Sequence, residues 1–146
     1  MMDRSDARNR IIPATCQQVF AAISTAERLA RWWGPAGFSN TFHHFDFRPG
    51  GLWTLTMHGP DGQDYPNESR FLRIEPDRRV EIEHLSGHHF TLSLELEARG
   101  PGTLLRWRQV FDSPQHFQTI CAFVAKANEQ NLDRLSAEVA RGLLAR

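Results

Sequence analysis

The spacing of hydrophobic positions divides the chain into three helical stretches and a set of strands. Residues 15–23 begin with a capping-box pattern and place their apolar residues on one helical face. A second short helix is predicted over residues 25–33, and Gly34-Pro35 ends it, because a glycine followed by a proline stops a helix. A third, long amphipathic helix is predicted over residues 114–141.

Between the second and third helices, apolar and polar residues alternate with a period of two. Residues 51–58, 80–85, 90–98 and 103–111 follow this pattern, and turns rich in glycine and proline separate them. One-sided burial of this kind is typical of an antiparallel sheet with one face in water. We therefore predict an α+β domain: a strand, two short helices, about six further strands, and a long C-terminal helix across the concave face of the sheet.

The length and charge of the chain exclude several classes of protein. The 146 residues suit a single domain, 1–146, with a core over about residues 10–140. The formal net charge is +0, which argues against a nucleic-acid partner. We predict no membrane insertion, because no apolar run approaches the roughly 18 residues of a membrane span, and the N-terminus lacks a secretory signal. Cys16 and Cys121 lie in apolar helical patterns and are expected to be buried free thiols of a cytoplasmic protein.

The seven histidines raise the question of a metal site, and their spacing argues against one. His43-His44 and His88-His89 are adjacent pairs, and neighbouring side chains on a strand point to opposite faces. The chain contains no Cys-x-x-Cys or His-Glu-x-x-His ligand set, and no Gly-x-Ser-x-Gly nucleophile elbow. We predict no metal, no cofactor and no catalytic residue.

Positions predicted to face inward hold four polar residues: His43, His84, Gln109 and Asn128. Burying such a group unpaired costs roughly 1–3 kcal/mol, so each needs a protein partner, a water or a ligand. Either these groups bond to one another and to the backbone, or they line a cavity between sheet and helix with aromatic walls. The candidate cavity residues are His43, Phe45, Trp53, Met57, Phe71, His84, Phe90, Trp107, Gln109, Phe117, Cys121, Val124 and Asn128.

Two adjacent tryptophans end the second short helix. Consecutive helical residues point about 100° apart, so Trp32 and Trp33 cannot both face the core from one helix. We therefore expect one of them inside and the other at the surface or in an interface.

The order of several motifs resembles one bacterial family. The motifs are Ser24-Thr25-Ala26-Glu27-Arg28-Leu29-Ala30-Arg31-Trp32-Trp33-Gly34-Pro35, residues 45–53, 57–62, 65–68, 74–76 and 108–111, and Asn131-Leu132-Asp133-Arg134-Leu135. Together they are similar to the activator-of-heat-shock-protein-90-ATPase homologue family, within the START-like (SRPBCC, birch-pollen-allergen-like) superfamily. The resemblance implies the helix-grip fold, in which a curved antiparallel sheet of about seven strands wraps around a long C-terminal helix and often encloses a hydrophobic cavity.

The inward polar residues and the family resemblance together are compatible with three functions. We expect non-catalytic binding of a small hydrophobic, amphipathic or aromatic ligand between the sheet and the C-terminal helix. The alternative is a cyclase- or hydrolase-type enzyme in which His84 or His43 is the general acid/base and Asn128 or Gln109 polarises a carbonyl. A second alternative is a co-chaperone-like interaction domain. The resemblance also allows a homodimer.

Overall fold

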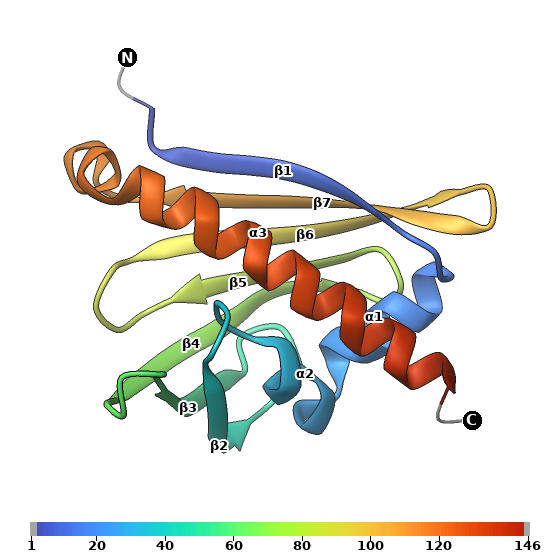
Figure 1. Cartoon of the computed structure of the whole chain (residues 1–146), viewed down its shortest axis with the longest axis horizontal. Coiled ribbons are helices and arrows are strands. Elements are labelled where there is room, and N and C mark those ends of the chain that lie inside the picture. The colour runs from blue at the N-terminus through green and yellow to red at the C-terminus, as the bar shows by residue number, and fades with distance from the viewer. Residues whose placement is uncertain (1–2, 145–146) are drawn as a thin grey trace.

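The computed structural model describes residues 3–144, which form a curved seven-stranded sheet, two short helices and one long helix (Figure 1). All neighbouring strands are antiparallel, in the order β1-β7-β6-β5-β4-β3-β2. This arrangement confirms the predicted α+β helix-grip fold. The elements are β1 (Ser5–Ile12), α1 (Cys16–Ser24), α2 (Ala26–Trp32), β2 (Ser39–Phe45), β3 (Leu52–His58), β4 (Asp64–Glu75), β5 (Arg79–His84), β6 (Phe90–Arg99), β7 (Gly102–Phe111) and α3 (Pro114–Leu144).

The long helix α3 crosses one face of the sheet, and α1 and α2 lie beside its C-terminal half (Figure 1). The start of α1 has the predicted capping box. The Thr15 hydroxyl accepts from the Gln18 backbone N–H at 3.1 Å, and the Gln18 side chain accepts from the Thr15 N–H at 2.8 Å. Within residues 3–144, none of the helices combines the length and the apolar character needed to cross a bilayer.

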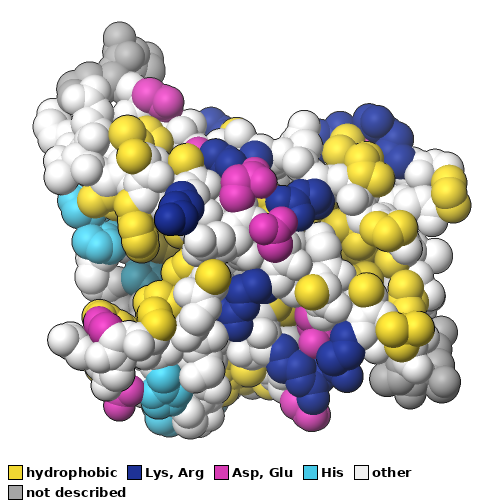
Figure 2. Space-filling model, in the orientation of Figure 1, with side chains coloured by type: hydrophobic (Ala, Val, Ile, Leu, Met, Phe, Trp, Pro, Cys, Tyr) yellow, Lys and Arg dark blue, Asp and Glu magenta, His cyan; other side chains and the backbone are white. Residues whose placement is uncertain are grey.

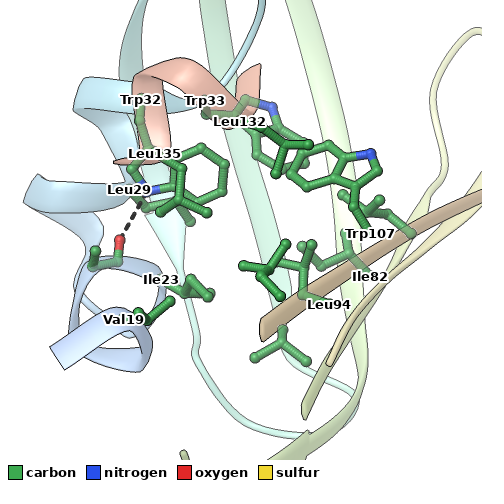
Figure 3. Close-up of a cluster of buried hydrophobic side chains, with 14 of the residues drawn as sticks. Val19, Ile23, Leu29, Trp32, Trp33, Ile82, Leu94, Trp107, Leu132 and Leu135 are labelled. Atoms are coloured by element: carbon green, nitrogen blue, oxygen red, sulfur yellow. Dashed lines mark hydrogen bonds between the residues drawn. The ribbon is translucent and has the colours of Figure 1, made fainter. Parts of the chain in front are cut away.

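The hydrophobic core lies between α1, α2, the C-terminal half of α3 and the middle of the sheet (Figure 3). Both Trp32 and Trp33 are buried in it, so the expectation that one of them lies at the surface is wrong. The reason is that α2 ends at Trp32, and Trp33 has an extended backbone that frees it from helical spacing. Trp32 Nε1 donates to the Ala22 carbonyl at 2.9 Å, and the Trp33 ring packs edge-on against Trp53.

Candidate functional site

A cavity of about 260 Å³ lies between the sheet and the first half of α3. Figure 2 shows the surface hollowed beside histidine side chains at the end where α3 begins. Residues from every strand except β1 and β2 contribute to its wall, together with α3 and the segment after α2. The lining residues are Trp33, Gly34, Pro35, Met57, Asn67, His84, His88, Phe90, Leu92, Trp107, Gln109, Phe111, Ile120, Phe123, Val124, Ala127, Asn128 and Asn131.

The cavity wall is mainly aromatic and aliphatic and carries no fixed charge. Trp33, Phe90, Trp107 and Phe111 provide large flat surfaces, and the exposed ring of Phe123 lies at the rim. Among residues 3–144, no Lys, Arg, Asp or Glu side chain lines the cavity. Such a wall suits an apolar molecule, and the few polar groups within it are the features that can orient one.

A chain of side-chain hydrogen bonds runs from β1 into the cavity wall. Asn128 Nδ2 donates to Asp6 Oδ2 at 2.8 Å and to Gln109 Oε1 at 2.9 Å. Asp6 also accepts two hydrogen bonds from the Arg8 guanidinium. Burial acts to raise the pKa of Asp6, but the hydrogen bonds from Arg8 and Asn128 outweigh it and leave this pKa below its usual value. The carboxylate is therefore charged at neutral pH.

A second amide holds the loop that forms one side of the cavity. Asn131 Nδ2 donates to the Trp32 carbonyl at 2.9 Å, and Asn131 Oδ1 accepts from the Gly34 N–H at 3.2 Å. One turn later, Arg134 donates to several carbonyls of the same loop, including Gly34 O at 2.8 Å and Phe38 O at 2.9 Å. Helix α3 therefore fixes the backbone of this loop through its side chains.

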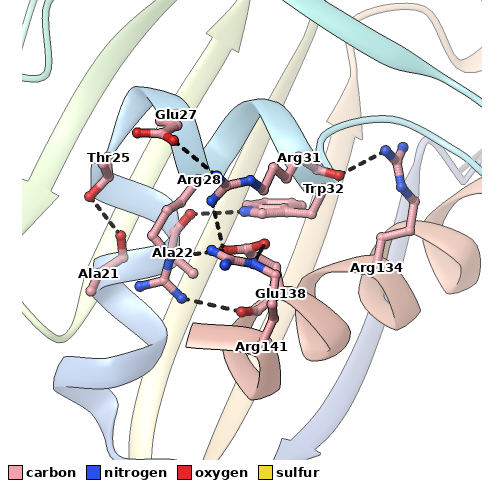
Figure 4. A network of polar contacts seen from close by, with 10 residues as sticks. All are labelled: Ala21, Ala22, Thr25, Glu27, Arg28, Arg31, Trp32, Arg134, Glu138 and Arg141. Carbon is pink, nitrogen blue, oxygen red and sulfur yellow. Dashed lines mark hydrogen bonds and ion pairs between the residues drawn. The ribbon is translucent and has the colours of Figure 1, made fainter. Parts of the chain in front are cut away.

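The same face of α3 continues into a charged network outside the cavity (Figure 4). Glu138 accepts from Arg28 Nε at 2.9 Å and from Arg141 Nη2 at 2.7 Å, and its side chain is 4% exposed. This network joins α2 to the C-terminal part of α3. It supports the frame of the cavity without lining it.

His84 lies in the cavity wall with each ring nitrogen close to an oxygen atom that accepts hydrogen bonds, and a neutral ring donates to only one of the two. Nδ1 is 2.7 Å from the His88 carbonyl oxygen and Nε2 is 2.6 Å from Asn67 Oδ1, while the ring stacks on Phe90. Burial lowers the pKa of His84, which favours the neutral imidazole. His88 in turn hydrogen-bonds to His116 at 2.7 Å and links the β5–β6 loop to the first turn of α3.

The structure places the predicted cavity residues in three groups. Seven of them line the cavity: Met57, His84, Phe90, Trp107, Gln109, Val124 and Asn128. Four belong to packed clusters. Phe45, Trp53 and Phe71 form one aromatic group in the main core, in which Trp53 and Phe71 stack at 5.7 Å, and Phe117 packs behind the cavity against Phe111.

His43 and Cys121 face solvent, contrary to the inward positions that the sequence pattern predicts. The register of β2 shifts between Phe42 and His44, so His43 is an extra residue that breaks the alternation. Its ring bonds to Thr56 on the outer face. Strand β1 contacts α3 at Asn128, and Cys121 lies two turns before that residue. No described element covers α3 at Cys121, so its side chain is exposed.

Sequence reasoning missed the wall residues contributed by the loop after α2 and by β4. Asn131 could have been found, because it lies three residues after Asn128 on the same helical face. The positions of Gly34 and Asn67 depend on how distant segments pack, and no local pattern indicates them.

Metal binding is not indicated by the geometry of the described residues. Among residues 3–144, no three His, Cys, Asp or Glu side chains converge closely enough to hold a metal ion.

Comparison with known proteins gives structural neighbours and a family. A solved protein from Nitrosomonas europaea superposes with a TM-score of 0.88 at 18% identity, covering 97% of each chain. One from Arthrobacter aurescens gives 0.85 at 21% identity over 94% of this chain and 86% of that one. An AHSA1-like protein from Aeromonas hydrophila gives 0.74 at 19% identity over 96% and 94%. These likenesses show the shared fold.

No curated protein matches the chain. The sequence profile of a protein family does match, and it spans residues 13–140. These residues include the loop after α2, the whole sheet except β1, and most of α3. The chain belongs to the family described as Activator of Hsp90 ATPase homolog 1-like protein.

Proposed function

We propose that this protein binds a small hydrophobic or amphipathic molecule in the cavity between the sheet and α3, without transforming it. The fold of the family is that of ligand-binding or co-chaperone-like domains in general. The observation that carries the proposal is the cavity itself. Protein interiors are close-packed and contain few voids larger than a water molecule. A mainly apolar hollow of about 260 Å³ that opens to the surface beside a packed aromatic core is therefore suited to a small apolar ligand.

The state of His84 favours binding over catalysis. A general base needs a ring nitrogen within reach of the substrate proton. A protein oxygen lies within 2.7 Å of each nitrogen of His84, the His88 carbonyl oxygen beside Nδ1 and Asn67 Oδ1 beside Nε2, so a substrate proton would have to displace one of them. Neither partner is a carboxylate that would make the imidazole more basic. His43, the other candidate, lies on the outer face of the sheet away from the cavity. His84 therefore serves as part of the wall.

A titration with a neutral apolar fluorophore, N-phenyl-1-naphthylamine, tests the proposal. Trp33 and Trp107 line the cavity, so binding should quench their emission and brighten the probe with one saturable site. The variant Ala127→Trp places a large ring into the cavity and should abolish binding. Ala122→Trp is the matched control, because Ala122 is an exposed alanine of the same helix outside the cavity, and it should bind like the wild type.

Two results would contradict this function. One is the absence of saturable binding to the wild-type protein. The other is unchanged binding to Ala127→Trp, which would place the fluorophore elsewhere on the surface. Circular dichroism of both variants confirms that they are folded before their affinities are compared.

We also propose that the protein acts in the cytoplasm. Both cysteines, Cys16 and Cys121, are free thiols, and free thiols persist in a reducing compartment. Fractionation of cells that produce the protein, followed by immunoblotting, tests this location, and recovery outside the cytoplasmic fraction would contradict it.

A further inference from the structure

Two buried amides in the cavity wall each keep one polar atom without a protein partner. Gln109 is 9% exposed and Asn128 is 6% exposed. Asn128 uses both N–H groups of its amide, one toward Asp6 and one toward Gln109, and this leaves its Oδ1 as a free acceptor. Gln109 accepts at Oε1 and keeps Nε2 as a free donor. Within residues 3–144 neither atom has a hydrogen-bond partner, and both residues line the cavity.

The orientation of both amides is set from outside the cavity by Asp6. An ionised carboxylate can only accept hydrogen bonds, so Asn128 must turn its NH₂ group toward Asp6. The same NH₂ group also donates to Gln109, so Gln109 must accept with its oxygen. Its own NH₂ group therefore points away from Asn128. Because Arg8 and Asn128 hold the pKa of Asp6 low despite its burial, this order persists at neutral pH. These two amides consequently present one donor and one acceptor in a fixed arrangement.

A secondary lactam is complementary to this pair of atoms. Its carbonyl can accept from Gln109 Nε2, and its N–H can donate to Asn128 Oδ1. An anionic ligand is disfavoured, because none of the described residues that line the cavity is a Lys or Arg and the Asp6 carboxylate lies directly behind Asn128. Burying an unpaired charge in an apolar site is costly.

The dimensions of the cavity limit the rest of the ligand. At the packing density of protein interiors, about 0.74, the available space holds about 190 Å³ of ligand atoms. This is the size of a fused two-ring aromatic with a short substituent, and a larger group, such as the phenyl ring of N-phenyl-1-naphthylamine, extends through the opening beside the exposed Phe123. The flat walls of Trp33, Phe90, Trp107 and Phe111 favour such a ring system through stacking and edge contacts.

Building on the proposed function, we infer that the cavity selects a neutral two-ring aromatic lactam, recognised by Gln109 Nε2 and Asn128 Oδ1. Three compounds of similar size test this selection by calorimetric titration: 2-quinolinone, which is a neutral lactam; naphthalene, which lacks the polar pair; and 2-naphthoate, which is an anion. The lactam should bind about tenfold more tightly than naphthalene, because two buried polar atoms find partners, and the anion should bind most weakly.

Variants of the polar chain separate recognition from shape. Gln109→Leu should weaken 2-quinolinone about tenfold and leave naphthalene unweakened. Gln118→Leu makes the same exchange at an exposed position of α3 outside the cavity and should change neither affinity. Asp6→Asn removes the carboxylate that orders the amides, so it should reduce the preference for the lactam while naphthalene still binds.

The outcomes distinguish this inference from the proposed function. If N-phenyl-1-naphthylamine and all three compounds fail to bind the wild-type protein, both fail together. If naphthalene binds as tightly as 2-quinolinone, if 2-naphthoate binds most tightly, or if Gln109→Leu keeps the lactam preference, the inference is overturned while binding in the cavity stands.

Discussion

Asn131 provides the sharpest test of how α3 holds the cavity wall. This residue is 7% exposed, and its amide pairs with the Trp32 carbonyl and the Gly34 N–H. Asn131→Ala removes both partners at once and leaves two backbone groups unpaired. A buried polar group without a partner costs about 1–3 kcal/mol, and the adjoining cavity can admit water to one of the two. We therefore expect the free energy of unfolding to fall by about 3 kcal/mol.

Thermal and urea unfolding measure this loss. The entropy of unfolding near the midpoint is about 2.1 cal/mol/K per residue, so a 146-residue chain loses about 10 °C in Tm for about 3 kcal/mol. Gln130→Ala is the matched control. Its side chain accepts from the Ala36 N–H at 3.0 Å at an exposed site, where water can replace it, and it should cost under about 1 kcal/mol.

A difference of less than about 1 kcal/mol between Asn131→Ala and Gln130→Ala would refute the reasoning. It would mean that the loop keeps its backbone groups satisfied without the buried amide. Arg134 would then be sufficient to hold the loop, since it donates to the carbonyls of Gly34 and Phe38 from the next turn of α3.

Three further predictions address the charged network, the loop glycine and the cysteines. Burial acts to raise the pKa of Glu138, but the hydrogen bonds from Arg141 and Arg28 outweigh it and keep this pKa below its usual value. The charged carboxylate therefore stabilises the fold above about pH 4.5. Glu138→Gln should cost about 1–2 kcal/mol at pH 7, and urea titrations should show the difference from wild type shrinking as the pH falls below 4.5. Gly34→Ala should lower the stability by about 1–2 kcal/mol, because φ is +98° and a side chain is strained there. The new Cβ would lie 2.7 Å from Met57 Cε, but this flexible side-chain end borders the cavity and can move, so Gly50→Ala, with φ of +83° in open space, should cost about the same; a much larger loss at Gly34 would show that the methionine cannot move. Cys121 is exposed and Cys16 is half-buried, so a maleimide should label one thiol per chain rapidly, and Cys121→Ser should remove that fast phase.

Local patterns were sufficient to predict most of the fold. The capping box at Thr15 predicts where α1 begins, and alternation over residues 90–98 and 103–111 predicts β6 and β7 with their correct buried faces. Each of these signals depends on neighbours within a few residues. The local sequence alone therefore determines the first turn of α1 and the alternating faces of β6 and β7.

Polar residues on the inward faces of β5 and β7 also predicted part of the cavity wall. His84 and Gln109 stand where an apolar residue would continue the alternation, and Asn128 interrupts the stripe of α3 in the same way. All three line the cavity. A polar residue at a buried register position was therefore the most informative feature of the sequence.

The remaining positions depend on contacts between distant segments. A bulge in β2 adds one residue, which turns His43 outward, and the run Phe42-His43-His44-Phe45 fits either register by pattern alone. Cys121 fits the helical stripe, but a stripe is buried only where another element covers it. No local pattern told which aromatic side chains fill the core and which border a space, because Trp53 and Trp107 follow the same alternation on their strands.

The concave face of the sheet has a packed half and a hollow half, and two tryptophans separate them. Trp33 packs against Trp53 at 4.8 Å and Trp107 against Trp32 at 6.4 Å, while Trp33 and Trp107 also border the cavity. Their rings are held on the core side, so the cavity wall is formed before a ligand arrives. A rigid wall lowers the conformational entropy that binding must remove. The aromatic core therefore supports the proposed ligand binding by holding these two rings in place, although most of its side chains never touch the cavity.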